Sequence, residues 1–208
     1  MDRTTRLSSL LGGFLQTFSD LMILNVLWFI CCLPLVTFGP ATSALCCVAL
    51  KLAGDEPVYL LKDFFSAFRR NFGQGLVLGL IGVLGAAVAV VDTLFALAQV
   101  GWLRVLYLGI ALFLCAAALS YFSYVFALHA RFDNSGACHV KNALRLAFVA
   151  PGQTLKIWLA FSVPVLCALY LPWDAVVRVG FVFLLLGVSA PAYFTARVQR
   201  RLFARFAS

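Results

Sequence analysis

The chain has 208 residues, of which 63% are hydrophobic and only 12% are charged, and its mean hydropathy is +1.00. A soluble protein of this size would expose too much apolar surface with such a composition, so we expect a single integral membrane domain over residues 1–208 with the lipid bilayer as its solvent. The net charge of +8 does not indicate nucleic acid, because the cations flank apolar stretches instead of gathering in one polar region.

The positions of the cations predict the orientation of the chain in the membrane. Short loops rich in Lys and Arg stay in the cytoplasm during insertion. Fourteen of the sixteen Lys and Arg residues fall at the two ends and in alternate connections between apolar stretches, namely Arg3, Arg6, Lys51, Lys62, Arg69, Arg70, Arg131, Lys141, Arg145, Lys156, Arg197, Arg200, Arg201 and Arg205. We therefore predict a multi-pass protein of the plasma membrane with both termini cytoplasmic.

The N-terminal part predicts an amphipathic helix and then a short hairpin. Residues 1–19 place apolar side chains at helical spacing, which is typical of a helix lying at the inner interface. Two short apolar segments follow, about 21–35 and 41–52, separated by the breaker sequence 34–40. A crossing helix needs about 20 residues, so this Pro/Gly-broken hairpin either crosses a thinned bilayer or re-enters on the same side. Both alternatives return the chain to the cytoplasm.

The connection 53–74 predicts a cytoplasmic interfacial helix. Asp55 or Glu56 is expected to cap this helix, with Pro57 in its first turn. One face over about 60–72 is aromatic and the rest is polar and basic, so the helix is expected to be amphipathic and to dock a partner. The expected docking residues are Phe64, Phe65, Phe68, Arg69, Arg70 and Asn71. A second amphipathic helix is expected near 140–149.

Four further hydrophobic segments complete an all-α membrane fold with six such segments. They are predicted at about 75–100, from the turn at 101–104 to 128, at 157–171 and at 175–196. The third carries a stripe of small residues that is expected to lie against another helix, because small side chains let helix backbones approach closely. The stripe consists of Gly75, Gly79, Gly82, Ala86 and Ala89.

The Pro/Gly hairpin is the first candidate binding site. A helix that begins in or near the membrane points free N–H groups and partial positive charge at whatever occupies the gap. The residues that we expect to contact a sugar-like or anionic solute there are Asn25, Trp28, Pro34, Thr37, Gly39 and Pro40. The alternative is a tight turn at the outer surface, with Asn25 forming a hydrogen bond between helices.

Asp92 is the second candidate, because it is the only acidic residue well within a predicted span. A carboxylate there is costly unless it is paired, hydrated or protonated, so it can couple proton movement to transport. The alternative is that it reaches the outer interface or pairs with Arg104.

Catalytic and metal-binding patterns are weak in this chain. His129, Asp133, Cys138 and His139 match no recognised zinc spacing, so we expect no metal. Neither a glycine-rich phosphate loop nor a serine-elbow motif is present. We therefore expect no cofactor and no enzymatic activity.

Three pieces of the first 75 residues resemble the YesL family of bacterial integral membrane proteins. These are Asn25-Val-Leu-Trp28, the segment Cys32–Ala41 that contains Pro34, Gly39 and Pro40, and the segment Asp63–Phe72. The resemblance implies a bacterial plasma membrane protein of uncharacterised function whose relatives are often encoded beside carbohydrate-uptake genes.

Two functions therefore stay open. The first is a non-enzymatic accessory or partner of a carbohydrate-transport complex. The second is a small solute transporter or channel that uses the Pro34–Pro40 hairpin and Asp92.

Overall fold

The computed structural model describes residues 3–54, 56–170, 180 and 185–206. Every secondary-structure element in that part of the chain is helical, so the all-α fold class is confirmed. The elements are α1 (Arg3–Cys32), the short 3₁₀ helix η1 (Leu35–Thr37), α2 (Phe38–Leu52), α3 (Leu60–Arg70), α4 (Phe72–Ala98), α5 (Gly101–Arg131), α6 (Gly136–Val149), α7 (Pro151–Tyr170) and α9 (Ser189–Phe206).

Four stretches of the described chain are long and apolar enough to cross a membrane, as in membrane proteins. They are Leu15–Cys32, Leu35–Leu52, Phe72–Ala98 and Gly101–Arg131, and they coincide with the first four predicted hydrophobic segments. The fifth predicted segment overlaps α7. The sixth, 175–196, lies largely outside the described residues.

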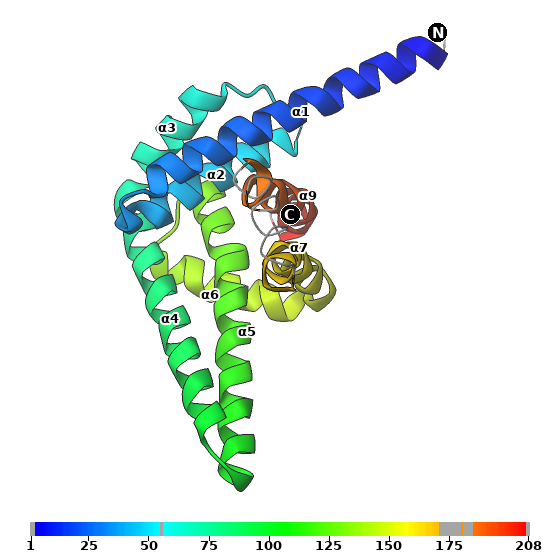
Figure 1. Ribbon diagram of the computed structural model, residues 1–208. Helices are drawn as coiled ribbons and strands as arrows, with labels where there is room; N and C mark the ends of the chain where they lie inside the picture. Colours follow the sequence, from blue (N-terminus) through cyan, green and yellow to red (C-terminus); the bar gives the residue numbers. More distant parts are fainter. Residues whose placement is uncertain (1–2, 55, 171–179, 181–184, 207–208) are drawn as a thin grey trace.

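Helix α1 differs from the prediction at its N-terminal end. A separate amphipathic helix over 1–19 was expected, but α1 runs without a break from Arg3 to Cys32. The intervening Gly12 and Gly13 cost helix stability without removing a backbone hydrogen bond, so they do not end the helix. Figure 1 shows α1 projecting beyond the other helices toward the N-terminus.

The predicted Pro/Gly break between α1 and α2 is confirmed, and Thr37 stabilises it. Its hydroxyl donates to the backbone oxygens of Cys31 and of Pro34, and it is 3.0 Å from the Pro34 oxygen. These bonds satisfy carbonyl groups that the end of α1 leaves without an intrahelical partner.

Helix α3 begins later than the sequence predicted. Pro57 precedes it and does not lie in its first turn. Instead of a cap from residue 56, Asp63 reaches back to accept a hydrogen bond from the Tyr59 N–H at 3.0 Å, and it also pairs with Lys51 of α2 at 3.0 Å. Partial burial alone would raise the pKa of Asp63, but the bonds from Lys51 and from the Tyr59 backbone outweigh it and lower the pKa. Asp55 lies outside the described residues.

Helices α4 and α5 form a long antiparallel hairpin that extends away from the remaining helices (Figure 1). The chain reverses at Gln99–Val100, and Gly101 begins α5 with φ +66°, a left-handed conformation that favours glycine. Large apolar side chains are exposed along both helices, as expected where lipid is the solvent.

The small-residue stripe on α4 is buried where it was predicted to be, except that Ala86 is only half-buried. A Cβ on Gly39 of α2 would lie 2.9 Å from the Gly79 Cα and closer still to the Gly75 carbonyl. A Cβ on Gly82 would lie 2.8 Å from the Tyr121 ring of α5. The small-residue stripe therefore packs against two elements, the start of α2 and the aromatic face of α5.

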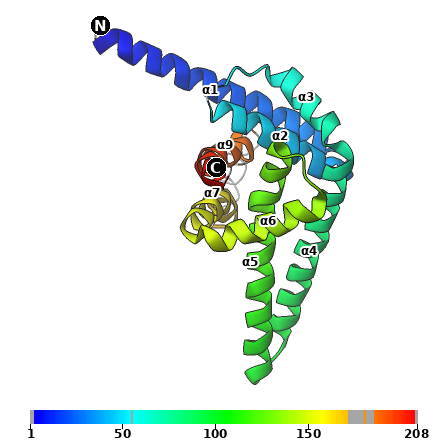
Figure 2. The same ribbon diagram turned by 180° about the vertical axis from the view of Figure 1, so that it is seen from behind.

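Helix α2 occupies the centre of the larger apolar core. Leu45 and Val48 are buried between α1, α3 and α9, and Phe64 of α3 is wholly buried against them. A second core joins α5, α6 and α7 around Tyr124, whose hydroxyl bonds to that of Thr154 at 2.8 Å. Figure 2 shows α6 crossing in front of α5.

Candidate functional site

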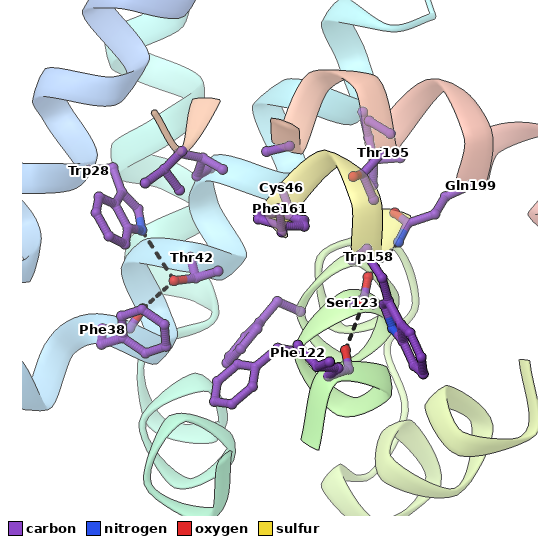
Figure 3. Close-up of a pocket in the computed structure, with 18 of the residues that line it drawn as sticks. Trp28, Phe38, Thr42, Cys46, Phe122, Ser123, Trp158, Phe161, Thr195 and Gln199 are labelled. Atoms are coloured by element: carbon purple, nitrogen blue, oxygen red, sulfur yellow. Dashed lines mark hydrogen bonds between the residues drawn. The ribbon is translucent and has the colours of Figure 1, made fainter. Parts of the chain in front are cut away.

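A cavity of about 540 Å³ lies among α1, α2, α5, α7 and α9. This volume is within the range of small-molecule binding pockets. Each of these five helices contributes at least one side chain to its wall (Figure 3), so segments far apart in the sequence meet around it.

One side of the cavity is aromatic. Trp28 of α1 donates its indole N–H to the Thr42 hydroxyl at 3.1 Å, and Thr42 in turn donates to the Phe38 carbonyl at 2.7 Å. The Trp28 and Phe38 rings meet edge to face at 6.0 Å, and Phe38 meets Phe122 of α5 at 6.2 Å. These contacts fix the rings that line this side.

The opposite side carries the polar groups (Figure 3). Gln199 of α9 donates from Nε2 to the Ser123 carbonyl at 2.6 Å and is buried. Thr195, one helical turn before Gln199, is 5% exposed, and its hydroxyl has no hydrogen-bond partner among the described residues. The same holds for the buried indole N–H of Trp158 on α7. Thr195 and Trp158 thus both line the cavity, and each carries a buried polar atom without a hydrogen-bond partner among the described residues.

The described lining residues carry few groups for acid–base chemistry. Its described residues include no Asp, Glu, Lys, Arg or His, and Cys46 is the one cysteine among them. General acid–base catalysis needs a positioned titratable group. The arrangement is suited to binding a neutral molecule.

The structure separates the residues that were predicted to act together at the hairpin. Trp28 lines the cavity, as part of a site different from the one predicted. Asn25 is wholly buried, and its Oδ1 accepts hydrogen bonds from the N–H groups of Val188 and Ser189 at 3.1 and 2.9 Å. Asn25 therefore joins α1 to the first turn of α9, as in the alternative interpretation of this residue.

The remaining hairpin residues have structural roles in the described chain. Pro34 is exposed in the turn, and Thr37 bonds to backbone carbonyls. Gly39 and Pro40 are buried against the Gly75 backbone. The first turn of α2 therefore packs against α4, and solute binding at this helix start stays a prediction.

Asp92 lies apart from both the hairpin and the cavity. It follows Gly79 by thirteen residues on α4, which is about 20 Å along a helix. Its Oδ2 is buried and has no hydrogen-bond partner among the described residues, and no ion pair with Arg104 is found there. Asp92 is therefore distant from the hairpin, and a solute path that uses both stays a prediction.

The predicted docking helix α3 uses much of its aromatic face internally. Phe64 is wholly buried and Asn71 is 4% exposed, so these two residues are not available to a partner. Phe68 is half-buried and stacks on Phe64. Phe65, Arg69 and Arg70 are exposed. Phe64 is unavailable because α2 packs against the aromatic face of α3, a contact that the sequence pattern did not predict.

Two of the four residues considered as metal ligands meet. The rings of His129 and His139 lie 5.2 Å apart, and both residues are buried. Among the described residues no group of three or more His, Cys, Asp and Glu side chains could hold a metal ion.

Sequence reasoning missed most of the cavity, including Thr42, Ser123, Trp158, Thr195 and Gln199. The available signal was weak. Thr195 and Gln199 stand four residues apart and share one helix face, but Arg197 and Arg200 beside them suggested a cytoplasmic end instead of a buried wall.

Comparison with known proteins supports the family resemblance. Residues 21–93 match the family described as "Protein of unknown function, DUF624", which is consistent with a YesL-like protein. The match covers α2, α3, most of α4 and the C-terminal part of α1 from residue 21. No curated protein and no solved structure matches the chain.

Proposed function

We propose that this chain is a non-enzymatic accessory protein of the bacterial plasma membrane that docks a partner of a carbohydrate-uptake system through α3. The observation that carries the proposal is the division of α3 into two faces. Phe64 and Ala67 hold the helix on α2, while Lys62, Phe65 and Arg69 are exposed. Aromatic and arginine side chains are enriched in protein–protein contacts.

The proposal places α3 and both termini in the cytoplasm. The support is that the cations of α3 and α6 belong to the same set of basic connections that predicts the orientation. The link to carbohydrate uptake comes from the YesL resemblance.

Uptake measurements test this role. Deleting the chain from its bacterial host should lower uptake of at least one carbohydrate, and the wild-type chain should restore it. The double variant Phe65→Ser/Arg69→Glu should fail to restore uptake while reaching the membrane at normal abundance. Phe194→Ser changes a similarly exposed aromatic residue on α9 and serves as the control. Normal carbohydrate uptake in the deletion strain would contradict the accessory role.

A small solute transporter is the second candidate, and the buried, unpartnered Oδ2 of Asp92 favours it. A carboxyl group in that position can take up and release a proton during transport. In proteoliposomes that contain only this chain, the transporter hypothesis predicts solute flux that Asp92→Asn abolishes. The accessory hypothesis predicts no flux from the wild type either.

A further inference from the structure

We propose that the cavity among α1, α2, α5, α7 and α9 binds one neutral, single-chain amphipathic lipid. Its apolar chain would lie against Trp28, Phe38 and Phe122, and its uncharged polar head would meet Trp158 and Thr195. This site is independent of the docking role of α3, because no residue of α3 lines the cavity.

The lack of charge in the lining sets the charge of the ligand. Burying an ionised group without a partner is strongly unfavourable, so an anionic or cationic ligand would need a counter-ion in the wall. None of the described lining residues supplies one.

The unpartnered polar groups set the position and chemistry of the head. The Trp158 indole can only donate a hydrogen bond, and the Thr195 hydroxyl can donate and accept. A buried polar group without a partner is costly, and a ligand that supplies the partner removes that cost. A head with two hydroxyls and an ester, as in a monoacylglycerol, offers both an acceptor for Trp158 and a partner for Thr195.

The arrangement also argues against a sugar. A sugar carries hydroxyl groups around its whole ring, and each buried one needs a hydrogen-bond partner. Here the free polar groups are confined to one side, while Trp28 and Thr42 on the other side already bond to each other. A molecule with one polar end and an apolar body fits this division.

The location of the cavity makes the bilayer a nearby source of such a ligand. Three of its five helices, α1, α2 and α5, contain candidate membrane spans. A ligand dissolved among lipid chains can therefore reach these helices without crossing water.

Photo-crosslinking in lipid nanodiscs tests the proposal. The probe is a monoacylglycerol with a diazirine in its chain. We expect saturable labelling of peptides that contain Phe38, Phe122 or Trp158, competed by unlabelled monoolein. Oleic acid, which carries the same chain with an anionic head, and glucose should compete much less. Labelling that does not saturate, or competition by oleic acid or glucose equal to that by monoolein, would overturn the proposal.

Two variants test the position of the head. Thr195→Val and Trp158→Phe each remove one hydrogen-bonding group with little change in shape, and each should weaken monoolein competition roughly five- to tenfold. Without ligand, Thr195→Val should raise the melting temperature, because it removes an unsatisfied buried hydroxyl. Thr154→Val is the matched control, since Thr154 is 4% exposed but bonded to Tyr124, and it should lower the melting temperature. Unchanged competition in both cavity variants would refute the assignment.

Discussion

Asn25 shows how one buried amide orders the start of a distant helix. The first N–H groups of a helix lack intrahelical partners, and a side-chain oxygen commonly satisfies them from the residue before the helix. Here Asn25 of α1 performs this role for α9 across 163 positions of the sequence. The two helices are thereby fixed in register beside the cavity.

Asn25→Leu should destabilise the chain by about 1–3 kcal/mol, because it leaves the N–H groups of Val188 and Ser189 buried without an acceptor. Thermal unfolding in detergent measures the change. Val26→Leu is the control, since Val26 is the next residue and is 42% exposed. Equal melting temperatures for Asn25→Leu and the wild type would show that another group can accept these bonds.

Helix contacts in this chain depend on where small residues meet backbone. Gly39, Gly75 and Gly79 bring α2 and α4 into direct backbone contact, whereas Gly85 lies on the same helix with nothing near its missing side chain. Ala111 of α5 is 3% exposed, so it is not a lipid-facing position that could serve as a control.

Gly79→Ala should destabilise the protein, because the new Cβ would lie 2.9 Å from the Gly39 Cα and neither backbone can yield cheaply. Gly85→Ala should instead leave stability unchanged or raise it by up to about 1 kcal/mol, since alanine favours a helix over glycine. The same detergent-melting assay compares the pair. If both variants melt alike, the close approach of α2 and α4 does not control stability.

The contact between α5 and α6 is expected to respond to pH through His139. Burial and the charge of nearby His129 lower the pKa of His139, and the Asn134 backbone and Asp133 offset part of this effect. The folded chain therefore takes up a proton on His139 less readily than the unfolded chain, so stability rises with pH across the window below about 6.5.

We expect the melting temperature to fall as the pH is lowered from about 7 to about 5, and His139→Gln should weaken this dependence. Asp63 does not contribute in this window. Its lowered pKa gives stability that is lost only as the pH falls below its usual value of 3.8. A melting temperature that drops equally in the wild type and the His139→Gln variant would assign the effect to other groups.

Local patterns predicted the elements well and their partners less well. Pro34 and Gly39 located the α1–α2 break, and the α4 glycines located a close contact, because each effect depends on a backbone property of that residue. The surroundings of the Phe64 and Asp92 side chains were harder to predict. Whether an aromatic face meets α2 or a partner, and whether a carboxylate meets a solute, depends on tertiary packing. Thr195 and Trp158 become neighbours of one cavity only when α7 and α9 meet.

At the scale of the whole molecule, the α1–α2 hairpin runs across the base of the α4–α5 hairpin and not alongside it (Figures 1 and 2). The contact of Gly39 with Gly75 and Gly79 places the α1–α2 turn beside the start of α4. That start follows the basic end of α3, which the charge distribution predicts to be cytoplasmic. From Gly79 to Ala98, α4 extends about 30 Å, the thickness of the hydrocarbon core. The tip at Gly101 is thus expected on the outer face and the turn near the inner one.

This arrangement favours a re-entrant hairpin over two full crossings, and cysteine labelling distinguishes them. Val36→Cys and Val100→Cys place thiols at positions that are 67% and 82% exposed, one in each turn. A membrane-impermeant maleimide added outside intact cells should label Val100→Cys and leave Val36→Cys unlabelled, with sites assigned by mass spectrometry. Asn134→Cys, in the connection between α5 and α6, should be labelled only in inverted vesicles. Labelling of Val36→Cys from outside would show that α1 and α2 cross the membrane fully and that their turn lies on the outer face.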